Sequence, residues 1–119
     1  MTHHIVLGVT GSIAAYKAVE ITSSLVKQGH RVTVIMTETA QRFINQVTFR
    51  SISHNQVITD LFVDNESYNP NHVSLADSAD IVVVAPATAN FIGKVAAGIA
   101  DDALTCTVMA AHSKVIIAP

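Results

Sequence analysis

Three short segments carry residue types that could bind a ligand: residues 10–12 (Thr-Gly-Ser), Thr37, and residues 86–90 (Pro-Ala-Thr-Ala-Asn). Each follows a run rich in Val and Ile that is typical of a buried strand. In an open parallel sheet, ligands bind at the carboxyl ends of the strands. We therefore expect the three segments to meet at one edge of the sheet and to form a ligand site there.

In the first segment, Gly11 would let the backbone come close to a ligand. The N–H groups of Ser12, Ile13 and Ala14 would point at an anion near the start of a helix, with the Ser12 hydroxyl as a further donor. The spacing matches neither common nucleotide fingerprint, because no Lys follows Gly11 and the pattern GxGxxG is broken. A tight turn capped by Ser12 would explain the same residues without a ligand.

The other two segments offer hydroxyl and amide groups. Thr37 stands where a dinucleotide enzyme would carry an acid for the ribose, and its hydroxyl suits a phosphate or a flavin edge better. The small residues of 86–90 leave room for a flat ligand, with Thr88 and Asn90 as hydrogen-bonding groups. The alternatives are a plain helix N-cap at Thr37 and a proline turn with an Asn cap.

His72 is the candidate catalytic residue. It would open a helix after the polar loop 64–71, at the same edge of the sheet if residues 57–58 form a parallel strand. The start of a helix favours the neutral imidazole, which suits a general base near neutral pH. A solvated or capping histidine is the alternative. No cluster of His, Cys, Asp or Glu has the spacing of a metal site, and we expect the remaining histidines at strand ends and in solvated turns: His3, His4, His30, His54 and His112.

The elements that would position these residues alternate along the chain. Continuous apolar runs predict strands buried on both faces, at 5–9, 32–36, 81–85 and 115–118, with a weak middle strand at 57–58. Apolar spacing and capping residues predict helices over 13–28, 38–43, 47–53, 72–78, 91–97 and 102–111, with Gly29 ending the first of them. This alternation predicts a doubly wound α/β fold with a parallel sheet.

Composition narrows the class of protein. The chain has 119 residues, 50% hydrophobic and 13% charged, against about 25% charged in an average domain. A chain with so few charged residues exposes much uncharged surface, which favours a subunit interface or a face covered by a cofactor. The net charge of −2 predicts no nucleic-acid partner and no membrane partner, and the run 81–85 is far shorter than the ~20 residues of a membrane helix. Cys106 is the only cysteine, which excludes an internal disulfide and fits the cytoplasm.

Four motifs in order, GVTGSIAAYKA, IMTETAQRFI, HVSLADSADIVVVAPATAN and KVAAGIADDALTC, resemble the homo-oligomeric flavin-containing cysteine decarboxylases. The resemblance covers essentially the whole chain and is strongest to the bacterial phosphopantothenoylcysteine decarboxylases. The stretch APATAN stands in for the PASANT motif of that family, and Thr88 keeps the hydroxyl of the serine that it replaces.

The resemblance implies a flavodoxin-like, Rossmann-like three-layer α/β/α fold that binds FMN. It implies loss of CO₂ from 4′-phosphopantothenoylcysteine to give 4′-phosphopantetheine for coenzyme A, with His72 as the base. It also implies trimers or dodecamers, and a phosphopantothenoylcysteine synthetase as an expected partner. The residues that would hold FMN are Gly11, Ser12, Ile13, Thr37, Pro86, Ala87, Thr88 and Ala89.

The chain departs from the family pattern at its end. The substrate-binding Pro-x-Met-Asn motif would begin at Pro119, directly after a strand, so residues 1–119 are expected to be one FMN-binding domain cut off at its C-terminal end. The cysteine that protonates the intermediate in the family belongs to a later loop, so Cys106 receives no catalytic role.

Three other functions remain open within the same fold. They are a peptidyl-cysteine decarboxylase, a flavin prenyltransferase, which would lack the HVSLA-type histidine, and a non-catalytic FMN-binding regulatory subunit. An NAD(P)-dependent dehydrogenase is disfavoured by the broken glycine pattern and by Thr37.

Overall fold

The computed structural model describes residues 2–60 and 71–119, with side chains for 2–60 and 75–119. Its centre is a four-stranded sheet in the order β2-β1-β3-β4. Every neighbouring pair of strands is parallel, and Leu7 of the central strand lies beside Val34 on one side and Val83 on the other. The strands are β1 (His4–Val9), β2 (Arg31–Met36), β3 (Ile81–Val84) and β4 (Lys114–Ile117). The predicted parallel α/β sheet is confirmed.

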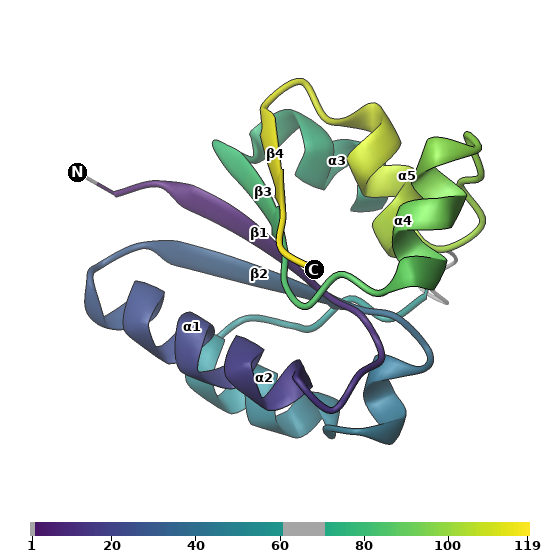
Figure 1. Ribbon diagram of the computed structural model, residues 1–119. Coiled ribbons are helices and arrows are strands. Elements are labelled where there is room, and N and C mark those ends of the chain that lie inside the picture. Colours follow the sequence, from purple (N-terminus) through teal and green to yellow (C-terminus); the bar gives the residue numbers. More distant parts are fainter. Residues whose placement is uncertain (1, 61–70) are drawn as a thin grey trace.

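Helices cover both faces of this sheet. One face is covered by α1 (Ala15–Lys27) and α2 (Gln46–Ser53) (Figure 1). The other is covered by α3 (Asn71–Ser78), α4 (Ala89–Ala96) and α5 (Ala103–Ala110) (Figure 1). The three layers explain why the strands have no polar face, since alternate side chains enter two different apolar cores.

The two cores use alternate residues of the central strands. Leu7 and Val34 pack with Phe49 of α2 in one core. Val6 and Val82 are buried with α4 and α5 in the other. All five side chains are fully buried, which accounts for the continuous apolar runs of β1, β2 and β3.

Turn and cap residues set the ends of several helices. Gly29 has a φ of 91° and follows α1, a left-handed conformation that glycine adopts without strain. The Asn45 side chain accepts a 2.9 Å hydrogen bond from the Val47 N–H at the start of α2. Asp102 and Thr105 form a reciprocal capping box at the start of α5.

Two predicted elements differ in the structure. The expected helix at 38–43 is only a three-residue 3₁₀ turn, Ala40–Arg42. Within the described residues, β4 lies at the edge of the sheet, and its Ile116 and Ile117 are 44% and 40% exposed, in place of the expected burial on both faces. The apolar residues of a strand indicate that its burial would be favourable, but they do not identify an element that covers it. Ile58 forms an isolated parallel bridge to Ile35, beside β2.

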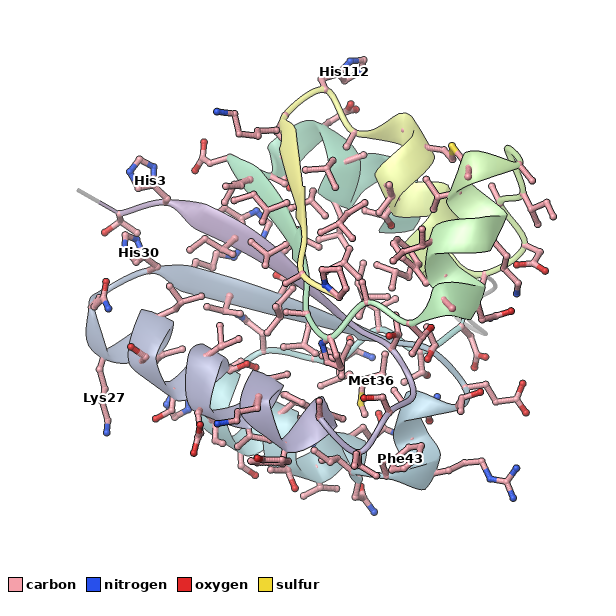
Figure 2. The ribbon with its side chains drawn as sticks, viewed as in Figure 1. His3, Lys27, His30, Met36, Phe43 and His112 are labelled. Atoms are coloured by element: carbon pink, nitrogen blue, oxygen red, sulfur yellow. The ribbon has the colours of Figure 1, made fainter. Side chains whose placement is uncertain are left out.

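The histidines also differ from the expectation in one case. His3 and His30 stack at the amino edge of the sheet with ring centroids 5.5 Å apart, as expected for strand ends (Figure 2). His4 is instead buried, with Nε2 2.8 Å from the Thr33 hydroxyl. Its first position in β1 brings it beneath the end of α3, which the sequence pattern does not show.

Among the described residues, none of the helices combines the length and apolar character required to cross a lipid bilayer.

Candidate functional site

The loops that follow β1, β2 and β3 meet at the carboxyl edge of the sheet, as predicted (Figure 1). They enclose a cavity of about 230 Å³ together with the start of α5. Most of the polar side chains that line the cavity are threonines, and Glu38, Lys94 and Asp102 are the charged residues of the lining. The full lining is Thr10, Gly11, Thr37, Glu38, Thr39, Thr88, Asn90, Phe91, Lys94, Asp102 and Thr105.

Thr10 joins the first loop to the third. Its hydroxyl donates to the carbonyl of Pro86 and accepts a 3.0 Å hydrogen bond from the N–H of Thr88. Its own backbone N–H also donates to the Pro86 carbonyl, at 3.3 Å. The side chain is 1% exposed. Thr10 belongs to the predicted first segment, but its bonds to the third segment could not be predicted, because the partners lie more than 70 residues away.

Gly11 joins the first loop to the second. A Cβ at this position would lie 2.3 Å from Cγ2 of Thr39 and 2.9 Å from its backbone carbonyl carbon. The second loop is also held by the Thr37 N–H, which donates to the carbonyl of Val9 at 3.1 Å. The close approach that Gly11 permits in this structure is therefore to Thr39.

Thr88 is the N-cap of α4, and Thr37 makes a similar bond in the turn that leads to Ala40–Arg42, whose N-cap is Thr39. The Thr37 hydroxyl accepts from the Ala40 N–H at 3.1 Å, and the Thr88 hydroxyl accepts from the Phe91 N–H at 3.3 Å. The cap of α4 is thus Thr88, and the alternative of an Asn90 cap is wrong because Asn90 lies inside the helix. A hydroxyl that accepts one bond keeps its own proton as a donor, so both residues could also bind a ligand at the cavity wall.

The first loop presents unpaired N–H groups. The Ala14 N–H donates to the Ser12 hydroxyl at 3.0 Å, so the expectation that Ala14 faces an anion is wrong for this conformation. Within residues 2–60 and 71–119, the N–H groups of Gly11, Ser12 and Ile13 have no acceptor. Successive free N–H groups before a helix form a concave site for an anion such as a phosphate.

The remaining predicted cofactor residues do not line this cavity. Ser12 and Pro86 are partly exposed, Ala89 is exposed, and the Ile13 side chain is 82% exposed. Ala87 is buried, and its N–H donates to the carbonyl of Ala118 at 2.8 Å. Their contacts with FMN stay predictions.

Lys94 and Asp102 are lining residues that the sequence analysis did not assign to the site. Lys94 follows Asn90 by four positions in α4, a spacing that places both on one helix face. Its Nζ lies 3.1 Å from the Asp101 carboxylate. Asp102 lies at the cavity because it is the N-cap residue of α5. A cap of this kind can be predicted from the sequence.

Cys106 lies near this end of α5. Its pKa is raised by burial and by the carboxylates of Asp102 and Asp101. The thiol donates to the Ala100 carbonyl at 3.3 Å. A raised pKa disfavours the nucleophilic thiolate form of Cys106.

His72 is the second residue of α3, as predicted. α3 ends at Ser78, whose carbonyl lies 3.3 Å from Nδ1 of His4 at the amino edge of the sheet. Eight helical residues rise about 12 Å, so the start of α3 lies toward the carboxyl edge. The polar loop predicted at 64–71 lies outside the described residues up to residue 70, and a role for His72 stays a prediction.

The fold and the cavity define an α/β domain with a ligand site at the carboxyl edge of a parallel sheet. The profile of the family described as Flavoprotein matches residues 1–119. The chain therefore belongs to the Flavoprotein family.

Relatives with known names agree with this family. The chain is 51% identical over 116 residues to the coenzyme A biosynthesis bifunctional protein CoaBC of Bacillus subtilis, covering 98% of this chain and 29% of the relative. It is 47% identical over 115 residues to the protein of the same name from Mycobacterium tuberculosis H37Rv, covering 97% of this chain and 27% of the relative. The chain thus spans less than a third of the length of these curated relatives.

A solved structure, the FMN-dependent cysteine decarboxylase TvaF from thioviridamide biosynthesis, superposes with a TM-score of 0.89. It is 34% identical, and the match covers 97% of this chain and 71% of that one.

Proposed function

We propose that the cavity at the carboxyl edge binds FMN. At the cavity wall, the Gly11 N–H and the hydroxyls of Thr37 and Thr88 suit the phosphate and ribityl oxygens of FMN. The free N–H groups of Ser12 and Ile13 follow Gly11 just outside the cavity lining and would extend this donor set to the phosphate. This donor set fits FMN and is the observation that carries the proposal. Pro86, Ala87 and Ala89 would form the rest of the loop against the flavin.

We further propose that the bound FMN serves to decarboxylate 4′-phosphopantothenoylcysteine to 4′-phosphopantetheine in coenzyme A biosynthesis. FMN supplies a hydride acceptor, which protein side chains lack. The names of the relatives support coenzyme A biosynthesis, and TvaF supports chemistry on a cysteine carboxyl group. His72 would take up the proton of the substrate in the first step, because the start of α3 favours its neutral form.

The assembly is part of the same proposal. Residues 1–119 would act as one FMN-binding unit in a homo-oligomer, a trimer or a dodecamer, located in the cytoplasm. A phosphopantothenoylcysteine synthetase is the proposed partner, since the named relatives are bifunctional proteins.

The test is CO₂ release by the FMN-loaded full-length protein from two substrates, 4′-phosphopantothenoylcysteine and a peptide ending in cysteine. We expect a yellow protein that releases CO₂ from the first substrate at a much higher rate. Preference for the peptide would favour a peptidyl-cysteine decarboxylase. Bound FMN without CO₂ release from either substrate would favour a regulatory subunit, and a protein that does not bind FMN would overturn the proposal.

A further inference from the structure

Thr10 stands at the point where the β1–β3 ladder ends. The last paired residues are Gly8 and Val84. Two further backbone bonds follow them, from the Ala85 N–H to the Gly8 carbonyl at 2.9 Å and from the Thr10 N–H to the Pro86 carbonyl at 3.3 Å. Beyond these residues, β1 and β3 are each followed by a loop. The hydroxyl of Thr10 continues the connection, because it bonds to both the Pro86 carbonyl and the Thr88 N–H.

The hydrogen bonds of the Thr10 hydroxyl connect two sets of groups that are proposed to bind different parts of the ligand. The free N–H groups directly follow Thr10 in the first loop, and Thr88 carries the hydroxyl of the third loop. The distance between the two sets therefore depends on the Thr10 side chain. The Thr88 N–H has the Thr10 hydroxyl as its acceptor, whereas the Pro86 carbonyl also accepts from the Thr10 backbone.

We infer that Thr10 is a positioning residue for FMN, which holds the first and third loops at the separation that the cofactor requires. This inference rests on the proposed FMN site. Thr10 would act through the loops, without donating its hydroxyl proton to the ligand, since the only proton of that hydroxyl is donated to the Pro86 carbonyl.

The test compares Thr10→Val with Thr22→Val, a matched control in α1. Thr22 is also fully buried, its hydroxyl donates to the Ala18 carbonyl at 2.8 Å, and it does not line the cavity. The Kd for FMN is measured by quenching of flavin fluorescence, and unfolding by heat denaturation. Both variants should unfold at a lower temperature, but only Thr10→Val should bind FMN about fivefold or more weakly.

Thr10→Ser keeps both hydrogen bonds and should restore the Kd to within about twofold of the original chain. Equal Kd values for Thr10→Val and Thr22→Val would overturn the inference while leaving the FMN site intact. Failure of the unaltered chain to bind FMN would instead overturn the proposed function, and the inference with it.

If Thr10→Val does not fold, amide hydrogen exchange of the unaltered protein tests the inference about Thr10. FMN should slow exchange of the Thr88 N–H more than exchange of the Asp80 N–H, which donates to the His4 carbonyl at the opposite edge. Equal slowing of exchange at both amides would contradict the inference that Thr10 links the first and third loops at the FMN site.

Discussion

His4 shows how strongly the surroundings of one side chain change its chemistry. Its ring lies between the hydroxyl of Thr33 and the carbonyl of Ser78, at 2.8 and 3.3 Å. Burial lowers the pKa of His4, and the nearby charge of Arg31 lowers it further. The folded protein therefore resists protonation of this ring more than the unfolded chain does.

We predict that the free energy of unfolding contains a pH-dependent contribution from His4. Above the unfolded pKa of about 6.5 the ring is neutral in both states, so its protonation costs nothing. As the pH falls below that value, the unfolded chain binds a proton that the folded chain disfavours, and stability falls. Denaturant titrations between about pH 7 and 5 should give a shallower loss for His4→Gln than for the original chain.

The exposed His54 at the end of α2 provides the control for this experiment. Its φ of 61° is tolerated by asparagine, so His54→Asn should fold normally. This variant should retain the pH dependence of the original chain. Parallel curves for His4→Gln and the original chain would contradict the prediction.

For His72 we predict a loss of turnover without loss of the cofactor. His72→Asn should lower the rate of CO₂ release by about 10²–10⁴-fold, the usual cost of removing a general base. Flavin absorbance of the purified variant should be unchanged, because the proposed FMN contacts lie in other loops. Wild-type activity would show that His72 is a helix cap, and loss of flavin would show a structural role.

Local patterns identified some site residues and missed others. Gly11, Thr37 and Thr88 were predictable because each follows an apolar run at the carboxyl end of a strand. Thr10 was predicted only as part of the segment 10–12, and its bonds were not predicted because the partners follow two strands later in the chain. For Lys94 the obstacle was similar, since only the packing of α4 beside α5 turns it toward the cavity.

At the scale of elements, two glycines on β1 and its loop control how closely neighbouring segments pack. A Cβ at Gly8 would lie 2.3 Å from a methyl group of Leu104, so this glycine lets α5 rest directly on the sheet. A Cβ at Gly11 would instead meet the backbone of Thr39. The first obstacle is a flexible side chain, whereas the second is part of a loop at the site.

We predict that Gly8→Ala and Gly11→Ala both destabilise the fold, by about 1–3 kcal/mol each, through overpacking. Only Gly11→Ala should also weaken FMN binding, because it separates the first two loops. Gly93→Ala, in the exposed helix α4 with no atom within 4 Å of the new Cβ, should be stabilising by about 0.5–1 kcal/mol. Denaturant melts and flavin titrations of the three variants check these outcomes, and normal FMN affinity of Gly11→Ala would contradict the role of loop spacing.

The elements themselves were more predictable than their surroundings. All four predicted strands are present within one residue of their expected limits, because each is a short apolar run between turn signals. The exposure of β4 was not predictable, since hydrophobicity does not identify the covering element. The 3₁₀ turn Ala40–Arg42 replaced a predicted helix, because a segment of six residues gains too few hydrogen bonds to stabilise an α-helix by itself.

At the scale of the whole molecule, several large apolar side chains are exposed around the start of α1 and α2. They are Ile13, Tyr16, Phe43 and Val47, with exposures of 82%, 56%, 48% and 47%. Phe43 projects from the outer side of the 3₁₀ turn in Figure 2. Such residues are typical of a surface that contacts another subunit.

We predict that this surface contributes to the proposed homo-oligomer. Val47→Asp should lower the molecular mass measured by light scattering, and its position in the first turn of α2 favours an acidic residue, so the fold should be retained. Met109→Asp, at an exposed position of α5, is the control and should leave the mass unchanged. Dissociation by the α5 variant alone would place the interface on the other layer, and a monomeric original chain would contradict the prediction.

The sheet order β2-β1-β3-β4 also has a consequence for biosynthesis. β1 and β2 are complete after residue 36, but the Thr10 partners arrive only with residues 86–88. At a synthesis rate of about 5–20 residues per second, roughly 3–10 s separate the two events. During that interval the nascent chain exposes one side of its central strand and lacks the third wall of the cavity. The proposed FMN site is therefore complete on the ribosome only after β3 and the loop that follows it have emerged and docked.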